Sequence, residues 1–534
     1  MEAMQARAVS LPTHTQHAAK QLPKRSAAAR LAVRGGRDEG VPRKFALTGL
    51  LSLALLAGCA VGPDYRRPDI DLGADYKQAV VKPHPSANAG WVQVDANAPV
   101  LRSDWWSLYE DSVLDDLMVE LQAQNLDLRL AEARYRQAQA SLQSARSGFF
   151  PTVGSNASVE RSGSGAGTAT GSQGGSGGFG GGASNSYSVS GSVSWEVDLW
   201  GRVRRSVESS QAALDASVAD IGDVRLSMQS TLAQTYFTLR VTDAEIRLME
   251  QTVQAYERSL RMTENRYQAG VAMMADVAAA RTQLENARTQ LLALQRERAQ
   301  LEHAAAVLLG RTPASFGLAA SDDVPRLPTI PVGMPSELLQ RRPDVAAAER
   351  RMAEANAQIG VAQAAWFPAL TLGAQGGFRS GQWAEWLTAP ARYWALGPAL
   401  ALTLFDGGAR SAAVEQARAA FDVQALTWRQ AVLAALQEVE DLLVQLRVMG
   451  QEQVTQGRAL ESAREALRLT QNQYEAGLID YLSVVQTETT ALSTERAALS
   501  LLQERLNASA RLIAALGGGW APEFRMRDSG ANRQ

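Results

Sequence analysis

The segment 56–59, Leu-Ala-Gly-Cys, carries the clearest chemical signal in the sequence. It has the pattern of a bacterial lipobox, in which small residues fit a peptidase groove and the thiol of Cys59 accepts a diacylglycerol. Arg43 and Lys44, followed by a short apolar stretch, give the layout of a secretory signal peptide. Cys59 is the only cysteine in 534 residues, which disfavours the alternative of a short buried helix with a chance cysteine. The motif predicts cleavage after residue 58 and a covalent lipid on Cys59.

Other reactive residues are too few or too scattered to suggest a site. A single cysteine allows neither an intrachain disulfide nor a multi-cysteine metal site. The formal net charge of −2 argues against a nucleic-acid binder held by phosphate contacts. We expect no metal, no cofactor besides the lipid and no catalysis, although an envelope hydrolase that uses only carboxylates stays open. The four histidines are dispersed along the chain, at His14, His17, His84 and His303.

A glycine- and serine-rich segment spans residues 162–186 and contains a formal G-x-G-x-x-G at 175–180. A nucleotide-binding loop of this type needs a following helix and an acidic residue about 20 positions further on. No helix is predicted there, and Trp195 occupies the position of the acid. We interpret the segment as a surface loop.

Residues 1–58 are predicted to be an N-terminal extension and a lipoprotein signal peptide. About 40 residues precede the signal, which is unusual, and we interpret Val41 as the true start of translation. The segment 1–58 holds nine Lys and Arg residues and three acids, so its removal leaves a mature chain with a net charge of −8. The mature protein is therefore acidic.

The rest of the chain reads as two copies of one unit, 116–310 and 344–517. Residues 127–134 match 344–351, and residues 265–270 match 472–477. From Gly201 and Gly408 onward the second register holds without gaps for about a hundred residues, which argues for duplication. The remaining segments are an N-terminal equatorial segment at 59–115, a connector at 311–343 and a C-terminal tail at 518–534.

Each unit contains a long helical hairpin, at 201–309 and at 408–516. The first arm of each hairpin has no proline and is rich in Ala, Leu, Gln, Glu and Arg, which favour helix. A helix of ~67 residues is about 100 Å long, too long for a globular core. Gly270 and Gly477 stand where the long helices must end. The returning helices are predicted from about Asp276 and Ser483.

Each unit also contains two predicted strands, about 151–160 and 187–198 in the first and about 368–378 and 394–404 in the second. Apolar and polar residues alternate over 187–198 for about 12 residues, enough for a tilted strand that spans a membrane. Pro398 should then lie at a bulge or a strand start. Four strands cannot close a barrel in lipid, so strands that span a bilayer would require several chains to share one barrel; three chains would give twelve strands. A small soluble sheet is the alternative.

Several motifs together resemble one family. The mature start 59–68, Cys-Ala-Val-Gly-Pro-Asp-Tyr-Arg-Arg-Pro, resembles that of outer-membrane efflux lipoproteins, the lipid-anchored NodT/OprM-type branch of the TolC family. The segments 198–202, 338–345, 404–408 and 515–520 also resemble that branch, as do Trp105-Trp106 and the segment 125–127. The resemblance covers nearly all of residues 59–521.

The resemblance implies a mixed α/β membrane protein in the outer membrane of a Gram-negative bacterium. Three chains would form a 12-stranded β-barrel, continued by a long periplasmic α-helical barrel of coiled-coil hairpins. The homotrimer would be the passive exit duct of a tripartite efflux system. Its partners would be a periplasmic adaptor and an inner-membrane pump of the resistance-nodulation-division type. No nucleic acid and no catalysis are implied.

The resemblance also implies two kinds of site at the hairpin ends. Relatives dock the adaptor at the hairpin turns, and they close the channel with a ring of Asp on the last helix. Ser483 and Gln486 match the positions of that ring, so other residues must replace the acids. The docking candidates are Tyr267, Gly270, Val271, Tyr474, Gly477 and Leu478, with the two tyrosines as braces between neighbouring hairpins. The gate candidates are Asp276, Asp480, Leu482, Gln486 and Glu488.

Two other classes of function stay open from the residues alone: the envelope hydrolase that uses only carboxylates, and a structural lipoprotein. A structural lipoprotein of the envelope with coiled-coil arms would explain the helices but not the alternating strands. For each candidate acid, an ordinary solvated charge at a helix end is the simpler alternative. The transported substrates cannot be read from the sequence, because a wide, wet duct need not bind them.

Overall fold

The computed structural model describes residues 60–70, 76–77, 91–93, 103–163, 183–321, 323–332 and 341–520. All of them belong to the second of the two units into which the chain divides, Gly58–Gln534. The predicted signal segment 1–58, the lipidation site Cys59, most of the glycine-rich loop and the tail beyond residue 520 lie outside the described residues.

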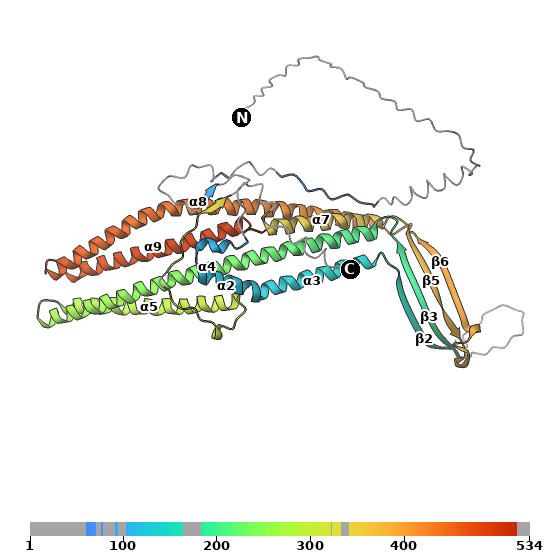
Figure 1. Ribbon diagram of the computed structural model, residues 1–534, viewed down its shortest axis with the longest axis horizontal. Coiled ribbons are helices and arrows are strands. Elements are labelled where there is room, and N and C mark those ends of the chain that lie inside the picture. Colours follow the sequence, from blue (N-terminus) through green and yellow to red (C-terminus); the bar gives the residue numbers. More distant parts are fainter. Residues whose placement is uncertain are drawn as a thin grey trace, which may run out of the picture. The chain divides into compact units, whose positions relative to one another are not determined.

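Two long helical hairpins dominate the structure (Figure 1). The first consists of α4 (Arg202–Gln268) and α5 (Met274–Leu308), and the second of α8 (Ala409–Glu475) and α9 (Tyr481–Ala515). Both long arms have 67 residues and both returning arms have 35. The returning helices begin two residues earlier than the sequence predicted.

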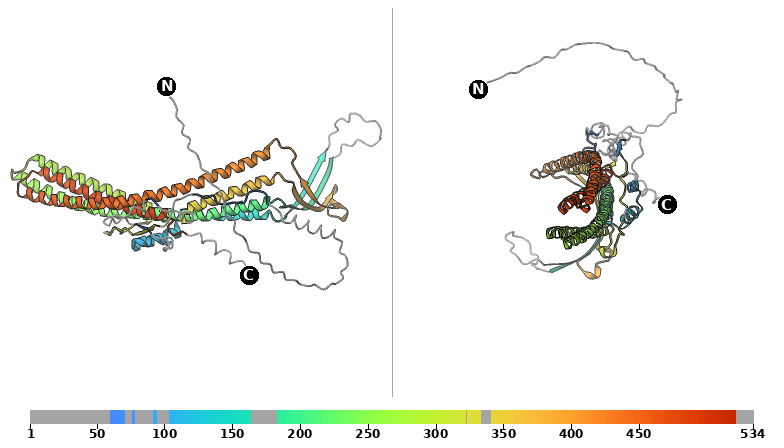
Figure 2. Two further views of the ribbon diagram at one scale, coloured as in Figure 1. Left: turned by 90° about the horizontal axis from the view of Figure 1, so that it is seen from above. Right: turned by 90° about the vertical axis from the view of Figure 1, so that its left-hand side faces the viewer.

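The hairpin helices follow one another in a curved layer, in the order α8, α9, α4, α5 (Figure 2). Three shorter helices accompany this layer: α2 (Ser112–Gln124), α3 (Leu126–Ser147) and α7 (Pro343–Ala364). The helix α7 packs against both α4 and α8, and α3 packs against α4. Among the described residues, no helix is long and apolar enough to cross a membrane.

A four-stranded antiparallel sheet lies at the other end of the long helices from the hairpin turns (Figure 1). Its order is β2 (Thr152–Gly163), β3 (Ala183–Val197), β5 (Ala369–Ser380) and β6 (Arg392–Ala401). β2 and β6 each pair on one side only, so both edges of the sheet are open in this chain.

The last strand differs from its predicted bounds of 394–404. β6 ends at Ala401, so Leu402 and Leu404 lie beyond it. Pro398 lies inside the strand opposite Leu372, and not at a bulge or a strand start. An edge strand accepts this because the missing N–H group can face away from the neighbouring strand.

Aromatic side chains gather at both ends of the sheet. At one end Trp383 lies 5.4 Å from Tyr187 and 5.1 Å from Trp386, measured between ring centroids. At the other end Trp200 stacks on Phe367 with centroids 4.7 Å apart. Short elements complete the fold: β1 (Trp91–Gln93), paired in parallel with β4 (Ile330–Val332), and the 3-10 turns η1 (Trp105–Tyr109), η2 (Pro313–Ser315), η4 (Trp383–Glu385) and η5 (Ala389–Ala391).

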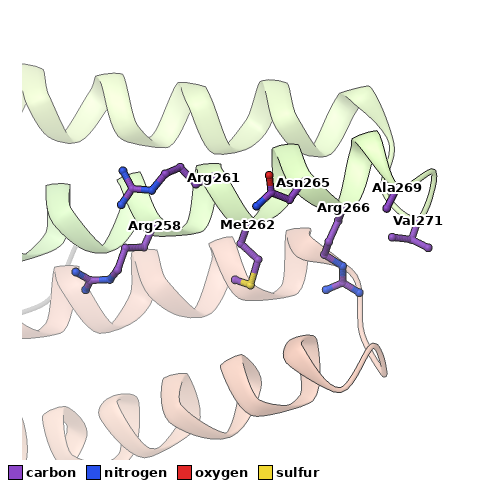
Figure 3. A pocket seen from close by; sticks show the side chains of 7 residues that line it. All are labelled: Arg258, Arg261, Met262, Asn265, Arg266, Ala269 and Val271. Atoms are coloured by element: carbon purple, nitrogen blue, oxygen red, sulfur yellow. The ribbon is translucent and has the colours of Figure 1, made fainter.

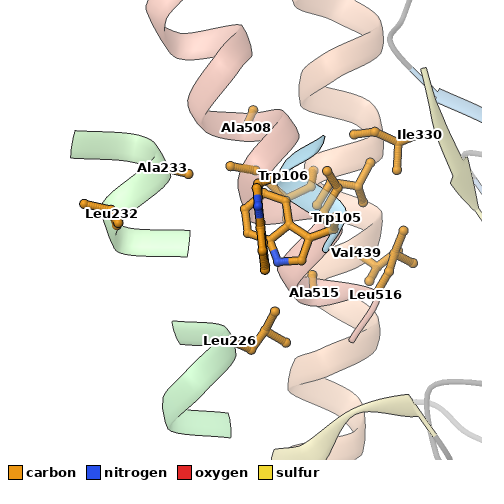
Figure 4. Close-up of a cluster of buried hydrophobic side chains, with 14 of the residues drawn as sticks. Trp105, Trp106, Leu226, Leu232, Ala233, Ile330, Val439, Ala508, Ala515 and Leu516 are labelled. Carbon is orange, nitrogen blue, oxygen red and sulfur yellow. The ribbon is translucent and has the colours of Figure 1, made fainter. Parts of the chain in front are cut away.

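The largest apolar core lies beside the middle of α4 and α8, where α2, η1 and the end of α9 meet them (Figure 4). Trp105, Trp428 and Phe237 are its largest fully buried side chains. The ring of Tyr109 lies 4.7 Å from that of Phe237, and its hydroxyl is 2.6 Å from Ser509 Oγ on α9. The core therefore joins both repeats to the segment that precedes them.

Residues 60–70 form an N-terminal strap along the helices. Arg205, near the start of α4, donates hydrogen bonds to the carbonyl oxygens of Val61 and Gly62 and to the carboxylate of Asp64, at 2.9–3.2 Å. Asn356 on α7 donates to the Pro63 carbonyl oxygen at 2.9 Å.

The strap also depends on close backbone approach. A Cβ on Gly62 would lie 2.5 Å from the Gly360 Cα atom of α7, and a Cβ on Gly201 would lie 2.8 Å from Ala60. Both glycines also have positive φ angles, of 108° and 82°, which disfavour other residues. The strap thus brings Ala60 to the sheet end of α4.

Candidate functional site

The turns of the two hairpins are built alike. In the first, the N–H group of Gly270 donates to the Tyr267 carbonyl oxygen and that of Val271 to the Arg266 carbonyl oxygen, both at 2.9 Å. The second turn repeats this pattern with Gly477 and Leu478. These are Schellman motifs, which need a left-handed residue after the helix, and the two glycines have φ angles of 75° and 74°. The six predicted docking residues therefore lie in two equivalent turns.

The two predicted braces have different surroundings. Tyr474 is buried, and the Arg266 guanidinium lies 4.6 Å from its ring centroid. Arg266 also donates to the Tyr474 carbonyl oxygen at 3.0 Å, so this contact joins the end of α4 to the end of α8. Tyr267, at the matching position of the first hairpin, is exposed. Of these two tyrosines, Tyr474 is the one that links the hairpins within one chain. Bracing between chains stays a prediction.

The turns expose apolar side chains. Val271 is 68% exposed in the first turn and Leu478 is 75% exposed in the second. Met273 and Met274 are exposed beside Val271. Exposed apolar residues gathered at one place typically mark an interaction surface. The arrangement suits the docking role that the sequence predicted for these turns.

A groove runs along α4 up to the first turn, with a volume of about 530 Å³ (Figure 3). We call it the arginine groove. It was not predicted from the sequence, although Arg258, Arg261 and Arg266 recur there at helical spacing. Seven residues line it: Arg258, Arg261, Met262, Asn265, Arg266, Ala269 and Val271.

Two of the gate candidates, Asp480 and Asp276, act as helix caps. Asp480 precedes α9, and its carboxylate accepts hydrogen bonds from the Ser483 N–H group at 3.0 Å and the Ser483 hydroxyl at 2.6 Å. These bonds hold the pKa of Asp480 below its ordinary value. Asp276 is the third residue of α5 and bonds in the opposite direction, since it accepts from the N–H group of the N-cap residue Met273 at 3.0 Å. Helix capping alone explains why a carboxylate occupies each of these positions. The role of the two acids as gate residues stays a prediction.

The other gate candidates divide between two faces of α9. Leu482 and Gln486, four residues apart, are both exposed and lie on one face. Glu488 is on the packed face and is only 8% exposed. Gln471 of α8 donates to one of its carboxylate oxygens at 3.4 Å, and burial raises the pKa of Glu488 to about 7. Glu488 therefore does not share a surface with Leu482 and Gln486.

The chemistry of the remaining groups is limited. Within the described ranges no cluster of three His, Cys, Asp or Glu residues is placed to hold a metal. Cys59 itself is outside those ranges, but the residue after it, Ala60, packs against Gly201 at the sheet end of α4. The long helices end in turns with exposed apolar residues on one side and in an open-edged sheet on the other. Such an arrangement suits an element that connects two different surroundings.

Comparisons with known proteins agree with this geometry. A family model described as outer membrane efflux protein matches residues 117–311 and 334–518. The probable efflux pump outer membrane protein TtgC of Pseudomonas putida is 29% identical over 477 residues, which cover 88% of this chain and 96% of that protein. Nodulation protein T of Rhizobium leguminosarum bv. trifolii is 28% identical, with the same shares covered.

A solved structure of the outer-membrane channel OprN superposes with a TM-score of 0.76 and 31% sequence identity. The superposition covers 86% of this chain and 100% of that one. The family match spans well over half of the sequence, and the fold of a solved channel accounts for the helices and the sheet together. The chain therefore belongs to the outer membrane efflux protein family, and it is an efflux channel of the outer membrane.

Proposed function

We propose that three copies of this chain form one passive exit duct. The observation that carries this proposal is the four-stranded sheet with two open edges, β2 and β6. An open edge inside a bilayer leaves backbone groups without hydrogen-bond partners at a cost of several kcal/mol each. Three sheets joined edge to edge make a 12-stranded barrel, which removes every edge. The aromatic clusters at the two ends of the sheet suit the two interfaces of a membrane.

The helical layer supports the same assembly. Its two flanks, α8 and α5, belong to different repeats, and among the described elements neither is followed by a further long helix. Three curved layers placed in a ring would close an α-barrel. At 1.5 Å per residue each 67-residue helix is about 100 Å long, which suits a duct across the periplasm. Equal arm lengths in the two hairpins support an origin by duplication of one unit.

The same proposal gives each end of the duct a role. The hairpin turns dock a periplasmic adaptor that couples the channel to an inner-membrane pump of the resistance-nodulation-division type. The channel itself performs no catalysis, since the pump supplies the work. Cys59 carries the lipid, because the strap holds the next residue, Ala60, at the sheet end of α4, where the membrane would lie.

The assembly can be tested on the purified, lipidated protein. We expect a heat-modifiable trimer on unboiled gels and ion conductance in planar bilayers. A structural lipoprotein with coiled-coil arms would give neither result. Conductance without a trimer, or a trimer that never conducts, would rule out the shared barrel.

The exposed face of α9 gives a prediction for the gate. Replacing Leu482 with glycine, or Gln486 with alanine, is expected to raise single-channel conductance, because the side chains that narrow the duct become smaller. The repeat places Ala275 of α5 at the position that matches Leu482. Ala275→Gly is therefore the matched control and should leave conductance unchanged. An unaltered conductance in the Leu482 variant would remove Leu482 from the gate.

A further inference from the structure

The arginine groove has a positive charge that the chain does not neutralise. None of the seven described lining residues is acidic. Arg258 and Arg261 form no ion pair or hydrogen bond with the described part of the chain, and both are exposed. The nearby acids of α4 are committed elsewhere, since Glu257 pairs with Arg288 at 2.9 Å and Glu264 pairs with Arg281 at 3.3 Å. The unpaired guanidiniums thus remain available to a partner.

The spacing of the groove residues is that of one helix face. Arg258 and Met262 are four residues apart, as are Met262 and Arg266, and Ala269 follows three residues later. Side chains at these intervals form a row along the helix into which the side chains of a second helix can pack. Val271 continues the row at the turn as an exposed apolar side chain. Arginine and methionine are both enriched in protein interfaces. Figure 3 shows these side chains along α4.

The second hairpin provides an internal comparison. The repeat that pairs Gly270 with Gly477 places Glu465 at the position of Arg258, and Gln473 at the position of Arg266. Arg261 corresponds to Arg468, but Arg468 forms an ion pair with Glu465 at 2.6 Å. The matching face of α8 is therefore neutral. A structural requirement of the turn would apply to both hairpins, so the excess charge on α4 needs another explanation.

We propose that the arginine groove binds an acidic amphipathic helix of the periplasmic adaptor. The carboxylates of that helix would repeat every three or four residues against Arg258 and Arg261, with an aliphatic side chain against Val271. This inference rests on the proposed function, because it specifies the chemistry of the adaptor that the turns dock. It also makes the two turns of one chain unequal, since only the first attracts an acidic partner.

The experiment compares two matched variants of the full-length, lipidated channel, Arg261→Glu and Arg468→Glu. Binding of the purified adaptor of the same efflux system is measured by biolayer interferometry at several salt concentrations. We expect Arg261→Glu to weaken binding about 10-fold at low salt and to reduce its salt dependence, because like charges then face each other. Arg468→Glu should change the affinity less than about 2-fold, and Arg258→Glu should behave like Arg261→Glu.

Two further measurements keep the outcomes separate. Each variant is checked for the trimer on unboiled gels and for conductance. Equal weakening by the two matched variants, or an unchanged affinity in Arg261→Glu, would overturn the proposal. Loss of the trimer in Arg261→Glu alone would also overturn it, because the groove would then be a contact between copies of this chain. If the unaltered protein neither forms trimers nor conducts, the proposed function fails, whatever the groove binds.

Discussion

Replacing Phe237 with alanine is expected to lower the free energy of unfolding by about 3–5 kcal/mol. The ring is fully buried in the core beside the middle of α4, against Tyr109 of η1. Its removal leaves a cavity that the surrounding helices cannot fill, because the contacts come from segments of both repeats. The loss should appear as a lower denaturant midpoint of the helical circular dichroism signal, with the slope of the transition unchanged.

Two variants serve as controls for this cavity. Phe237→Leu keeps most of the volume and should cost less than about 1.5 kcal/mol. Leu292→Ala removes an exposed side chain on α5 and should stay within about 0.5 kcal/mol of the unaltered protein. Similar midpoints for Phe237→Ala and Leu292→Ala would show that this core does not hold the repeats together.

Replacing Glu488 with glutamine is expected to stabilise the protein at high pH only. Burial raises the pKa of the Glu488 carboxyl from an ordinary value of 4.5 to about 7. Below pH 4.5 the carboxyl is protonated in both folded and unfolded chains, so the substitution changes nothing. Between pH 4.5 and 7 the unfolded chain loses this proton while the folded chain keeps it, so folding becomes less favourable as the pH rises. Above pH 7 the folded carboxyl ionises as well, and the cost is complete. The glutamine variant should then be more stable by up to about 3 kcal/mol.

The surroundings of Glu488 explain why the charge stays uncompensated. Gln471 of α8 donates one long hydrogen bond, and the second carboxylate oxygen has no hydrogen-bond partner. Tyr256 of α4 and Tyr481 of α9 interact electrostatically with Glu488. An ordinary tyrosine is neutral at these pH values, and burial raises the pKa of both further, so neither can compensate the charge. Denaturant midpoints at pH 4, 6 and 8 would check the prediction. A constant difference between the two proteins at all three pH values would contradict it.

Much of the helical architecture could be predicted, because the helix-forming composition and the glycines at the helix ends indicate the same bounds. Residues 202–268 contain no proline, and Gly201 and Gly270 mark both ends, so the predicted and observed bounds of α4 nearly coincide. The starts of the returning helices were placed two residues late. For α9 the capping signal is Asp480, whose carboxylate accepts from the third following N–H group. Asp480 was predicted as a gate residue instead of a cap.

The candidate site was less predictable because tertiary contacts divide residues that look alike in sequence. Tyr267 and Tyr474 occupy matching positions, yet only Tyr474 receives an arginine from the other hairpin. The burial of Glu488 did have a signal, since it continues the stripe of Tyr481, Val484 and Val485 at helical spacing. A carboxylate on such a stripe belongs to the packed face of its helix.

The N-terminal strap has a consequence for the order in which the chain folds. Tyr65 bonds to Glu349, 284 residues later, and Pro63 accepts from Asn356, 293 residues later. Such contacts close very long loops and cannot form until α7 has left the translocation machinery. The strap is thus made early but docks late. Under the proposed lipidation of Cys59, the chain beside that residue has not yet docked when an acylating enzyme acts on it, and docking of the strap requires that both repeats have come together.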